Sequence, residues 1–294
     1  MAKTRELRRR IRSIENTRQI TKTMEMVATS RLKRAQDRVV AARPYAQALT
    51  DVLGSLLAPE LVERFPLLRV PPSPPRRVAL VGLTSNRGLC GAFNANLIRE
   101  TRHRIRELEA EGAEVELHLV GRKGIGFFRF LGRATASARQ DITDRPTMEQ
   151  AVQLVTPLME RFAAGALDRV EIIFARFVSA LQTPPTRLPI LPLAPPDRRT
   201  GGTPSRAALN YILKPSAAEL LERLLPLYVQ NQVFRALVEN AASEQGARRT
   251  AMKNATDSAG DMIDLLRRTY NRARQAQITQ EIAEIVGGSE ALKG

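Results

Sequence analysis

Two long stretches, one at each end of the chain, carry apolar residues at alternating spacings of four and three. This heptad pattern is typical of a coiled coil, and over residues 3–57 it predicts one helix of about 80 Å. Polar residues interrupt it at Arg18, Thr21 and Glu25, and Pro44 offers a place to bend. The positions are Leu7, Ile11, Ile14, Arg18, Thr21, Glu25, Ala28, Leu32, Ala35, Val39, Ala42, Ala46, Leu49, Leu53 and Leu56.

The C-terminal stretch, residues 216–286, repeats the pattern and predicts a second long helix, which Pro226, Gly246 and Gly260 weaken locally. Two such helices can cover each other's apolar stripes as an antiparallel pair, with the remaining chain inserted between them. The predicted stripe runs through Phe234, Val238, Ala241, Gln245, Arg248, Met252, Ala255, Ala259, Met262, Leu266, Thr269, Ala273, Ala276, Gln280 and Ala283.

Short apolar runs alternate with amphipathic segments in the middle of the chain. Strands are expected at residues 77–83, 115–121 and 169–181, and helices at residues 94–112, 123–132 and 147–164. Residues 183–193 are rich in proline and fit only an edge strand. The predicted fold is therefore a small, Rossmann-like α/β insert with a mostly parallel sheet, joined to a long antiparallel α-helical coiled coil formed by the terminal helices.

This interpretation divides the chain into four parts. A discontinuous coiled-coil shaft takes residues 1–57 and 210–294, and the α/β insert takes residues 77–193. A proline-rich linker at residues 58–76 and a loop at residues 194–209 join them.

Composition favours a non-secreted chain with an acidic partner. The 294 residues carry a formal net charge of +16, and the single cysteine, Cys90, excludes an intrachain disulfide and fits a reducing compartment. The charged N-terminus predicts no signal peptide, and no apolar run approaches the ~20 residues of a membrane span. The partner could be nucleic acid, an anionic membrane surface or an acidic protein face.

The chain offers little chemistry of its own. The segment GLTSNRGLCGAFN, residues 82–94, follows a predicted strand but lacks a phosphate-binding fingerprint, and residues 121–126 are equally weak, so both are expected to be tight turns. His103 and His118 fit no metal-ligand spacing, and Cys90 is expected to be a small core residue. We therefore expect no catalytic, cofactor-binding or metal-binding residues.

Positive charge gathers at the N-terminus. Residues 1–43 hold 13 Lys and Arg against 4 acidic residues, a balance of +9, and few cations have an acidic partner four residues away. A solvated helix face or a partner-binding face would both show this pattern. A nucleic-acid arm would more often carry aromatic residues for stacking, and this helix has only Tyr45.

Three blocks of sequence resemble one family, the γ subunits of F-type ATP synthases. They are RELRRRIRSIENTRQITKTMEMVATSRLKRAQ, NRGLCGAFNANLI and LVENAASEQGARRTAMKNATDSAGDMIDLLRRTYNRARQAQITQEIAEIVGG. The resemblance implies a shaft turning inside a hexamer of alternating α and β subunits, with the insert and the ε subunit on the membrane ring of c subunits. It implies no cofactor, a non-catalytic role, and a place at the cytoplasmic face of the bacterial membrane, reached only through the complex.

The resemblance also implies contact residues. Those expected to touch β subunits are Lys22, Met24, Arg31, Lys33, Arg34, Arg248, Arg274, Gln275 and Thr279, and those expected at the rotor ring are Tyr211 and Lys214. Asn86 stands where relatives commonly have Asp, and Lys214 where some have Glu. The charge change at Lys214 implies an acidic or neutral residue in the facing loop of the c subunit. With only Cys90, the regulatory cysteine pair of the chloroplast type looks absent.

Two other functions compete with this one. A basic coiled-coil protein that binds nucleic acid fits the charge but not the three blocks. A nucleotide-dependent enzyme using the middle domain lacks the phosphate-binding fingerprint it would need.

Overall fold

A computed structural model describes residues 2–56, 65–193 and 217–291 of the chain. The chain forms two compact units, one of residues 1–28 with 248–294 and one of residues 29–247. Helices α1 (Ala2–Leu56) and α6 (Ala217–Ala291) each contribute to both units. The two long helices predicted from the heptad pattern are confirmed, and Pro44 and Pro226 lie inside them.

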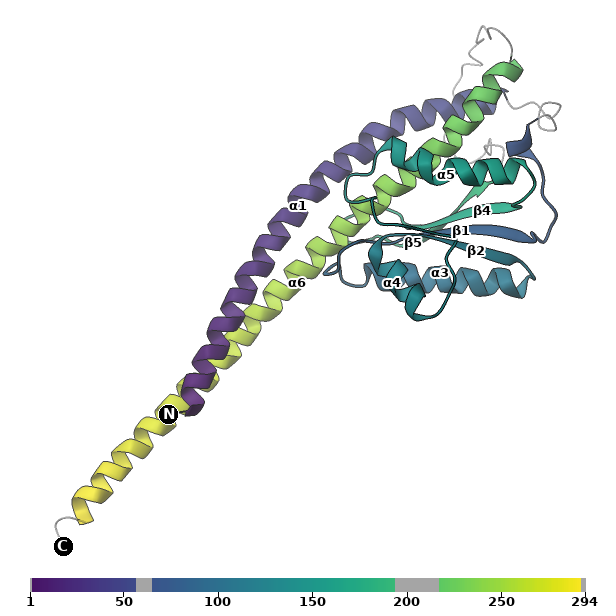
Figure 1. The fold of residues 1–294 in the computed structure, drawn as a ribbon. Coiled ribbons are helices and arrows are strands. Elements are labelled where there is room, and N and C mark those ends of the chain that lie inside the picture. Colours follow the sequence, from purple (N-terminus) through teal and green to yellow (C-terminus); the bar gives the residue numbers. More distant parts are fainter. Residues whose placement is uncertain (1, 57–64, 194–216, 292–294) are drawn as a thin grey trace. The chain divides into compact units, whose positions relative to one another are not determined.

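In the first unit, which we call the free-end pair, α1 and α6 run antiparallel (Figure 1). Side chains of the two helices meet along its length: Arg8 donates to the Tyr270 hydroxyl at 2.7 Å, and Arg267 donates to Glu15 at 2.7 Å. Thr4 lies 3.3 Å from the Gln277 side chain. Position numbers rise on α1 as they fall on α6, which is the antiparallel coiled coil that the stripes predicted.

The predicted stripe on α6 is wrong by one residue at every second position of the free-end pair. Ile263 is buried at 2% exposure, whereas the predicted Met262 is 52% exposed. The seam passes through Thr256, Ile263, Tyr270 and Gln277 rather than Ala255, Met262, Thr269 and Ala276. Both sets of positions fit a heptad pattern that starts at Met252. The alanines of the predicted set made it look apolar, so only the packing against α1 could distinguish the two sets.

The polar interruption of the stripe on α1 has a matching interruption on α6. The Thr256 hydroxyl donates to the Thr21 hydroxyl at 2.8 Å, so a hydroxyl pair replaces an apolar contact. A Cβ at Gly260 would lie 3.9 Å from Nε of Arg18, which shows that the arginine side chain crosses α6 at its glycine. The seam tolerates these residues because each meets a small or polar partner.

The second unit contains a five-stranded sheet with the order β3-β2-β1-β4-β5. Its first four strands are parallel, and β5 is antiparallel at the edge. The strands are β1 (Arg77–Leu83), β2 (Glu114–Val120), β3 (Ser137–Arg139), β4 (Arg169–Ala175) and β5 (Pro185–Leu191). The helices between them are α3 (Phe93–Ala110), α4 (Arg122–Phe130) and α5 (Met148–Ala163), and a 3₁₀ turn, η1 (Pro66–Leu68), precedes β1.

Two details of the sheet differ from expectation. Strand β4 ends at Ala175 rather than at residue 181, because the backbone of Ala175 is held by side chains of α6 and the chain then turns back into β5. Strand β3 was not predicted, since three residues carry no measurable periodicity. The proline-rich edge strand is confirmed: Pro185 and Pro189 lie in β5.

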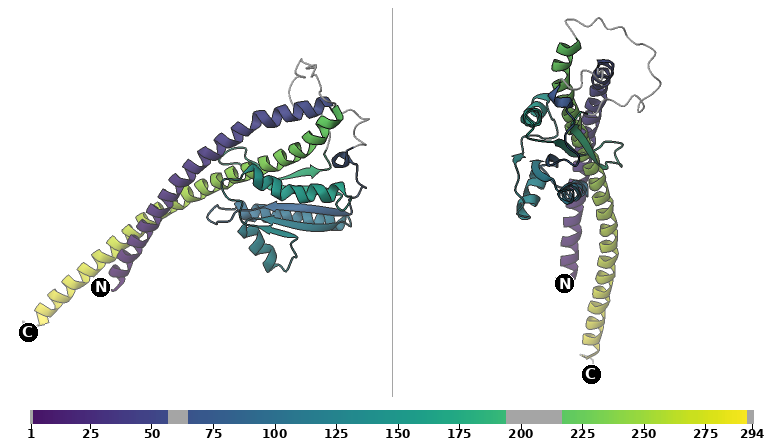
Figure 2. Two further views of the ribbon diagram at one scale, coloured as in Figure 1. Left: turned by 45° about the horizontal axis from the view of Figure 1, so that its top comes forward. Right: turned by 90° about the vertical axis from the view of Figure 1, so that its right-hand side faces the viewer.

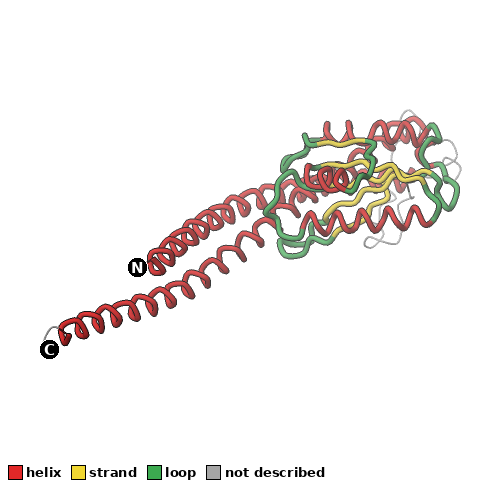
Figure 3. The backbone as a smooth tube through the Cα atoms, turned by 60° about the horizontal axis from the view of Figure 1, so that its bottom comes forward, coloured by secondary structure: helices red, strands yellow, loops and turns green. Residues whose placement is uncertain are grey.

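Helices cover both faces of the sheet (Figure 1, Figure 2 and Figure 3). One face packs on α5 and on the α6 residues Val229, Val233 and Leu237. The other face packs on α3 and α4 through residues such as Leu97 and Phe128. The part of α6 in this unit is therefore built into the core of the α/β domain.

Candidate functional site

The second unit joins the α/β insert to α6 by buried hydrogen bonds as well as apolar packing. The side chain of Asn240 accepts from the amide of Ala175 at 3.0 Å, and the Ser243 hydroxyl donates to its carbonyl at 2.8 Å. A Cβ at Gly246 would lie 3.3 Å from the carbonyl oxygen of Ala180, so the β4–β5 turn packs closely on the helix backbone. These contacts suit a domain that moves together with its helix.

Helix α1 packs on the same part of α6. Ala35 and Val39 of α1 meet Val238 and Ala242 of α6 in one cluster. Further along, leucines of both helices and of η1 form another cluster that contains Leu49, Leu53, Leu68, Leu221 and Leu225. Small residues at the first contact bring the helices close, and leucines fill the second.

The predicted partner contacts Lys22 and Met24 lie on α1 in the free-end pair. Lys22 is exposed and its ammonium is 3.4 Å from the carboxylate of Glu25, while Met24 is half-buried. An exposed ion pair of this kind contributes roughly 0–1 kcal/mol to stability. Lys22 therefore remains available to a partner at little cost to the fold.

The other three predicted cations of α1 lie in the second unit. Arg31 is 3.1 Å from Asp144, and Lys33 is 3.0 Å from Asp37. Arg34 donates to the hydroxyl of Ser30 at 3.2 Å. Lys33 is thus one of the few cations with an acidic partner four residues away, whereas the partner of Arg31 is 113 residues away in sequence.

Arg274, Gln275 and Thr279 are all exposed on α6. The Thr279 hydroxyl donates to the backbone carbonyl of Gln275 at 3.0 Å. Arg248 is half-buried. The expected ring contacts, Tyr211 and Lys214, lie outside the described residues.

A cluster of exposed aliphatic residues near the end of α6 was not singled out from the sequence. Thr4, at the start of α1, is opposite Gln277, and α6 continues to Ala291. We call the part of α6 beyond this point, residues 278–291, the overhang. Its exposed large aliphatic residues are Ile278, Ile282, Ile285 and Val286, at 46%, 57%, 71% and 53% exposure. The spacing of these isoleucines by four and then three residues could have identified them from the sequence. Only the structure shows that α1 does not reach far enough to cover them.

The backbone amides at the start of α4 are engaged by the chain itself. At the start of α4, the amide of Arg122 donates to the side chain of Asn86, that of Lys123 to the carbonyl of Ser85, and that of Gly124 to the hydroxyl of Thr84. A phosphate at a helix N-terminus needs such amides free. Residues 84–92 form a loop before α3, as expected of the first segment, whereas the tight turn expected at residues 121–126 is wrong, because Arg122 begins α4.

Cys90 is buried in a small polar cluster. The amide of Asn94 donates to its sulfur at 3.1 Å, and the hydroxyl of Ser85 lies 3.9 Å from it. Its position agrees with the expected core role.

The two histidines occupy different surroundings. The ring of His118 is buried, its Nδ1 lies 2.8 Å from the Ser137 hydroxyl, and burial lowers its pKa although Glu116 partly opposes the shift. The Arg161 guanidinium pairs with Glu116 and lowers the pKa of that carboxyl. His103 is exposed on α3.

Within the described ranges, no helix has the combination of length and apolar character that crossing a membrane requires.

Comparisons with known proteins agree along the whole chain. The sequence model of the ATP synthase family matches residues 3–292. The ATP synthase γ chain of Gemmatimonas aurantiaca is 63% identical over 100% of both chains. That of Leptospira biflexa strain Patoc 1 / Ames is 44% identical over 99% of this chain and 100% of its own.

Solved structures share the fold. The rotor of the Euglena gracilis mitochondrial ATP synthase matches with a TM-score of 0.64 at 22% identity, over 94% of this chain and 99% of that one. A central stalk and c-ring structure from Tetrahymena thermophila matches with a TM-score of 0.57 at 25% identity, over 80% and 99%. The paired terminal helices, the α/β insert and these full-length matches together show that the chain belongs to the ATP synthase γ-chain family.

Proposed function

We propose that this γ-family chain is the rotating shaft of its ATP synthase and has no catalytic site of its own. The free-end pair would turn inside a hexamer of alternating α and β subunits, whose β subunits do the chemistry. Ion flow through the membrane ring of c subunits would drive the turning. The complex would stand on the cytoplasmic face of a bacterial membrane, which this chain reaches only through its partners.

The observation that carries the proposal is the free-end pair with its overhang. Two helices share one narrow seam there, and beyond Gln277 four aliphatic side chains have no cover from α1. Monomeric proteins rarely leave such a surface without a partner. A socket formed by other subunits would cover it.

The contact residues follow from the same proposal. Lys22, Arg31, Lys33 and Arg34 would meet acidic segments of successive β subunits, since attraction between charges tolerates changes of register that close packing does not. Met24, Arg248, Arg274, Gln275 and Thr279 complete the proposed set.

At the other end of the shaft, Tyr211 and Lys214 would meet the c-ring beside the ε subunit. The facing loop of the c subunit would then carry an acidic or neutral residue opposite Lys214, since like charges in close contact repel by about 1 kcal/mol even in water. Sequencing that loop and measuring coupling in Lys214→Glu tests this part. A basic loop together with improved coupling in the variant would contradict it.

Co-expression with the α and β subunits of the same organism tests the main proposal. The chain should co-purify with both subunits and raise their ATP hydrolysis, and alone it should hydrolyse no ATP. Failure to associate with the subunits, or hydrolysis by the isolated chain, would contradict the proposal.

A DNA-retention assay at rising salt addresses the nucleic-acid alternative in the same preparation. Retention that falls steeply with salt, together with no binding to α and β, would favour that alternative.

A further inference from the structure

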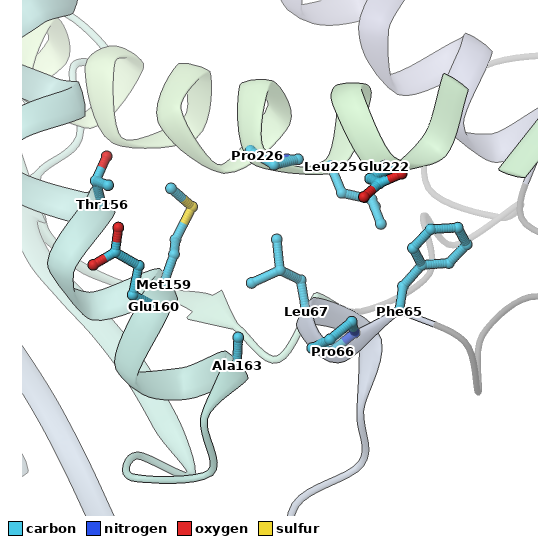
Figure 4. Close-up of a pocket in the computed structure, with 10 residues that line it drawn as sticks. All are labelled: Phe65, Pro66, Leu67, Thr156, Met159, Glu160, Ala163, Glu222, Leu225 and Pro226. Carbon is cyan, nitrogen blue, oxygen red and sulfur yellow. The ribbon is translucent and has the colours of Figure 1, made fainter. Parts of the chain in front are cut away.

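A cavity of about 270 Å³ lies in the second unit between η1, α5 and the first turns of α6 (Figure 4). Its walls are almost entirely apolar, with Leu67, Met159 and Leu225 facing one another across it. Each wall comes from a different element, so the cavity exists only where the α/β domain meets the helix. An apolar cavity of about 150 Å³ already holds a benzene molecule, so this one has room for a ring with a short chain.

The charged groups at this cavity are carboxylates. The carboxylates of Glu160, on α5, and Glu222, on α6, are exposed and lie at opposite ends of the apolar walls (Figure 4). No lysine or arginine is among the described residues that line it. Among the described residues, the charge at its rim is therefore negative, although the chain as a whole carries +16.

Two further groups lack their usual partners. Pro226 has no N–H, so the backbone carbonyl of Glu222, four residues earlier in α6, has no helical donor. The Thr156 hydroxyl oxygen is buried and makes no hydrogen bond with the described residues. Buried polar groups normally find partners, and the unpaired Thr156 hydroxyl belongs to a residue that lines the cavity.

We propose that this cavity binds a small amphiphilic cation, an apolar body bearing an ammonium group. The apolar part would fill the space beside Met159 and Leu225. The ammonium would donate to a carboxylate at the rim. An anion would be repelled by Glu160 and Glu222, and a neutral molecule would gain nothing from their charge.

The proposal can be tested on the full chain with three probes of matched shape: 4-phenylbutylamine, 4-phenylbutanol and 4-phenylbutyrate. The methyl group of Met159 lines the cavity, and the chain has seven methionines, so methyl NMR separates this site from others. Met159→Leu assigns the signal. The amine should shift the Met159 methyl signal and bind about fivefold more tightly than the alcohol, because exposed ion pairs contribute modestly. The carboxylate should bind more weakly than the alcohol.

Two variants and one control separate charge from shape. Glu160→Gln combined with Glu222→Gln should reduce the affinity for the amine to that for the alcohol. Ala163→Phe, at an exposed position in the cavity wall, should fill the space and abolish binding of all three probes. Glu149→Gln removes an exposed carboxylate from the same helix away from the cavity and should change nothing.

These measurements need no α or β subunits, so they test the cavity independently of the proposed function. Equal affinities for amine and alcohol, unaffected by the double Gln variant, would show that the cavity has no charge preference and would overturn the proposal. Binding of the amine without any shift of the Met159 methyl would place it elsewhere and would also overturn it.

Discussion

Asn86 joins three segments of the insert through one side-chain amide. Its NH₂ group donates to the carbonyls of Gln140 and Ile142 at 2.8 and 3.1 Å, and its oxygen accepts from the amide of Arg122 at 2.9 Å. An aspartate could replace only the last of these bonds. The asparagine therefore fits this loop through its donors, which a comparison of sequences alone does not explain.

We expect Asn86→Asp to lower the free energy of unfolding by about 1–2 kcal/mol, because two carbonyls lose their donor and face a carboxylate instead. Urea unfolding followed by circular dichroism measures this. Asn96→Asp is the matched control, since Asn96 only accepts, from Arg99, and a carboxylate still accepts. Equal stability of Asn86→Asp and the wild type would show that the loop does not depend on these bonds.

His118 should make stability fall as the pH drops below its ordinary pKa of about 6.5. Burial lowers its pKa in the folded chain, so as the pH falls the unfolded chain takes up a proton first, and stability is lost by at most about 1.4 kcal/mol per pH unit. His118→Gln should flatten this dependence.

The only other histidine, the exposed His103, supplies the comparison, because His103→Gln removes the same kind of side chain from a different place. Urea titrations at several pH values provide the measurement. A wild-type slope unchanged in His118→Gln would assign the pH dependence to other groups.

At the scale of elements, the register of α6 against α1 depends on single residues. Ile263 is buried in the seam of the free-end pair, whereas its neighbour Met262 points outward. Because a one-residue rotation exchanges these two, they report the register directly.

We expect Ile263→Ala to destabilise the free-end pair by about 2–5 kcal/mol, the usual cost of a buried large-to-small change, and Met262→Ala to cost less than about 0.5 kcal/mol. Hydrogen exchange of amides in residues 2–28 would measure the loss of protection. Similar protection in both variants would mean that the pair does not use this seam in solution.

In the second unit, α6 packs against several elements rather than against α1 alone. Within the second unit, α6 packs on α1, on α5 and on the end of β4, and buries Asn240 and Ser243 against Ala175. The free-end pair has one seam only. Stability is therefore concentrated in the second unit, and local opening should begin in the free-end pair.

At the scale of the whole molecule, the formal net charge of +16 favours association with acidic surfaces. Neutralising Lys22, Arg31, Lys33 and Arg34 together to glutamine should change the free energy of unfolding by less than about 2 kcal/mol, because each pair is partly or fully exposed. If the proposed contacts with β subunits exist, ATP hydrolysis should become poorly coupled to ion pumping in the assembled complex.

A variant with the same change in charge on the insert is the control: Arg99, Arg106, Arg122 and Arg129, all exposed, changed to glutamine. Measurements of ATPase activity and ion pumping in membrane vesicles compare the two. Normal coupling of ATP hydrolysis to ion pumping in the first variant would show that its four cations form only a solvated face.

Local pattern was enough to predict most of the elements. A heptad repeat reports burial along one side of a helix, and its periodicity alone located both long helices. Apolar runs located three strands of the insert, and proline placed the edge strand correctly, because a residue without an N–H cannot sit inside a sheet. The short β3 left no such trace, since its three residues are held by pairing with β2.

The sequence by itself determined the family, the two-helix plan and the class of the insert, because each rests on periodicity or on long blocks of matching residues. Only the tertiary structure decided which residues meet. The choice of Ile263 over Met262, the pairing of Arg31 with Asp144 and the exposure of Ile282 each depend on where a distant segment lies. Periodicity records that a side of a helix is buried, but the identity and the reach of the segment that buries it are properties of the folded chain.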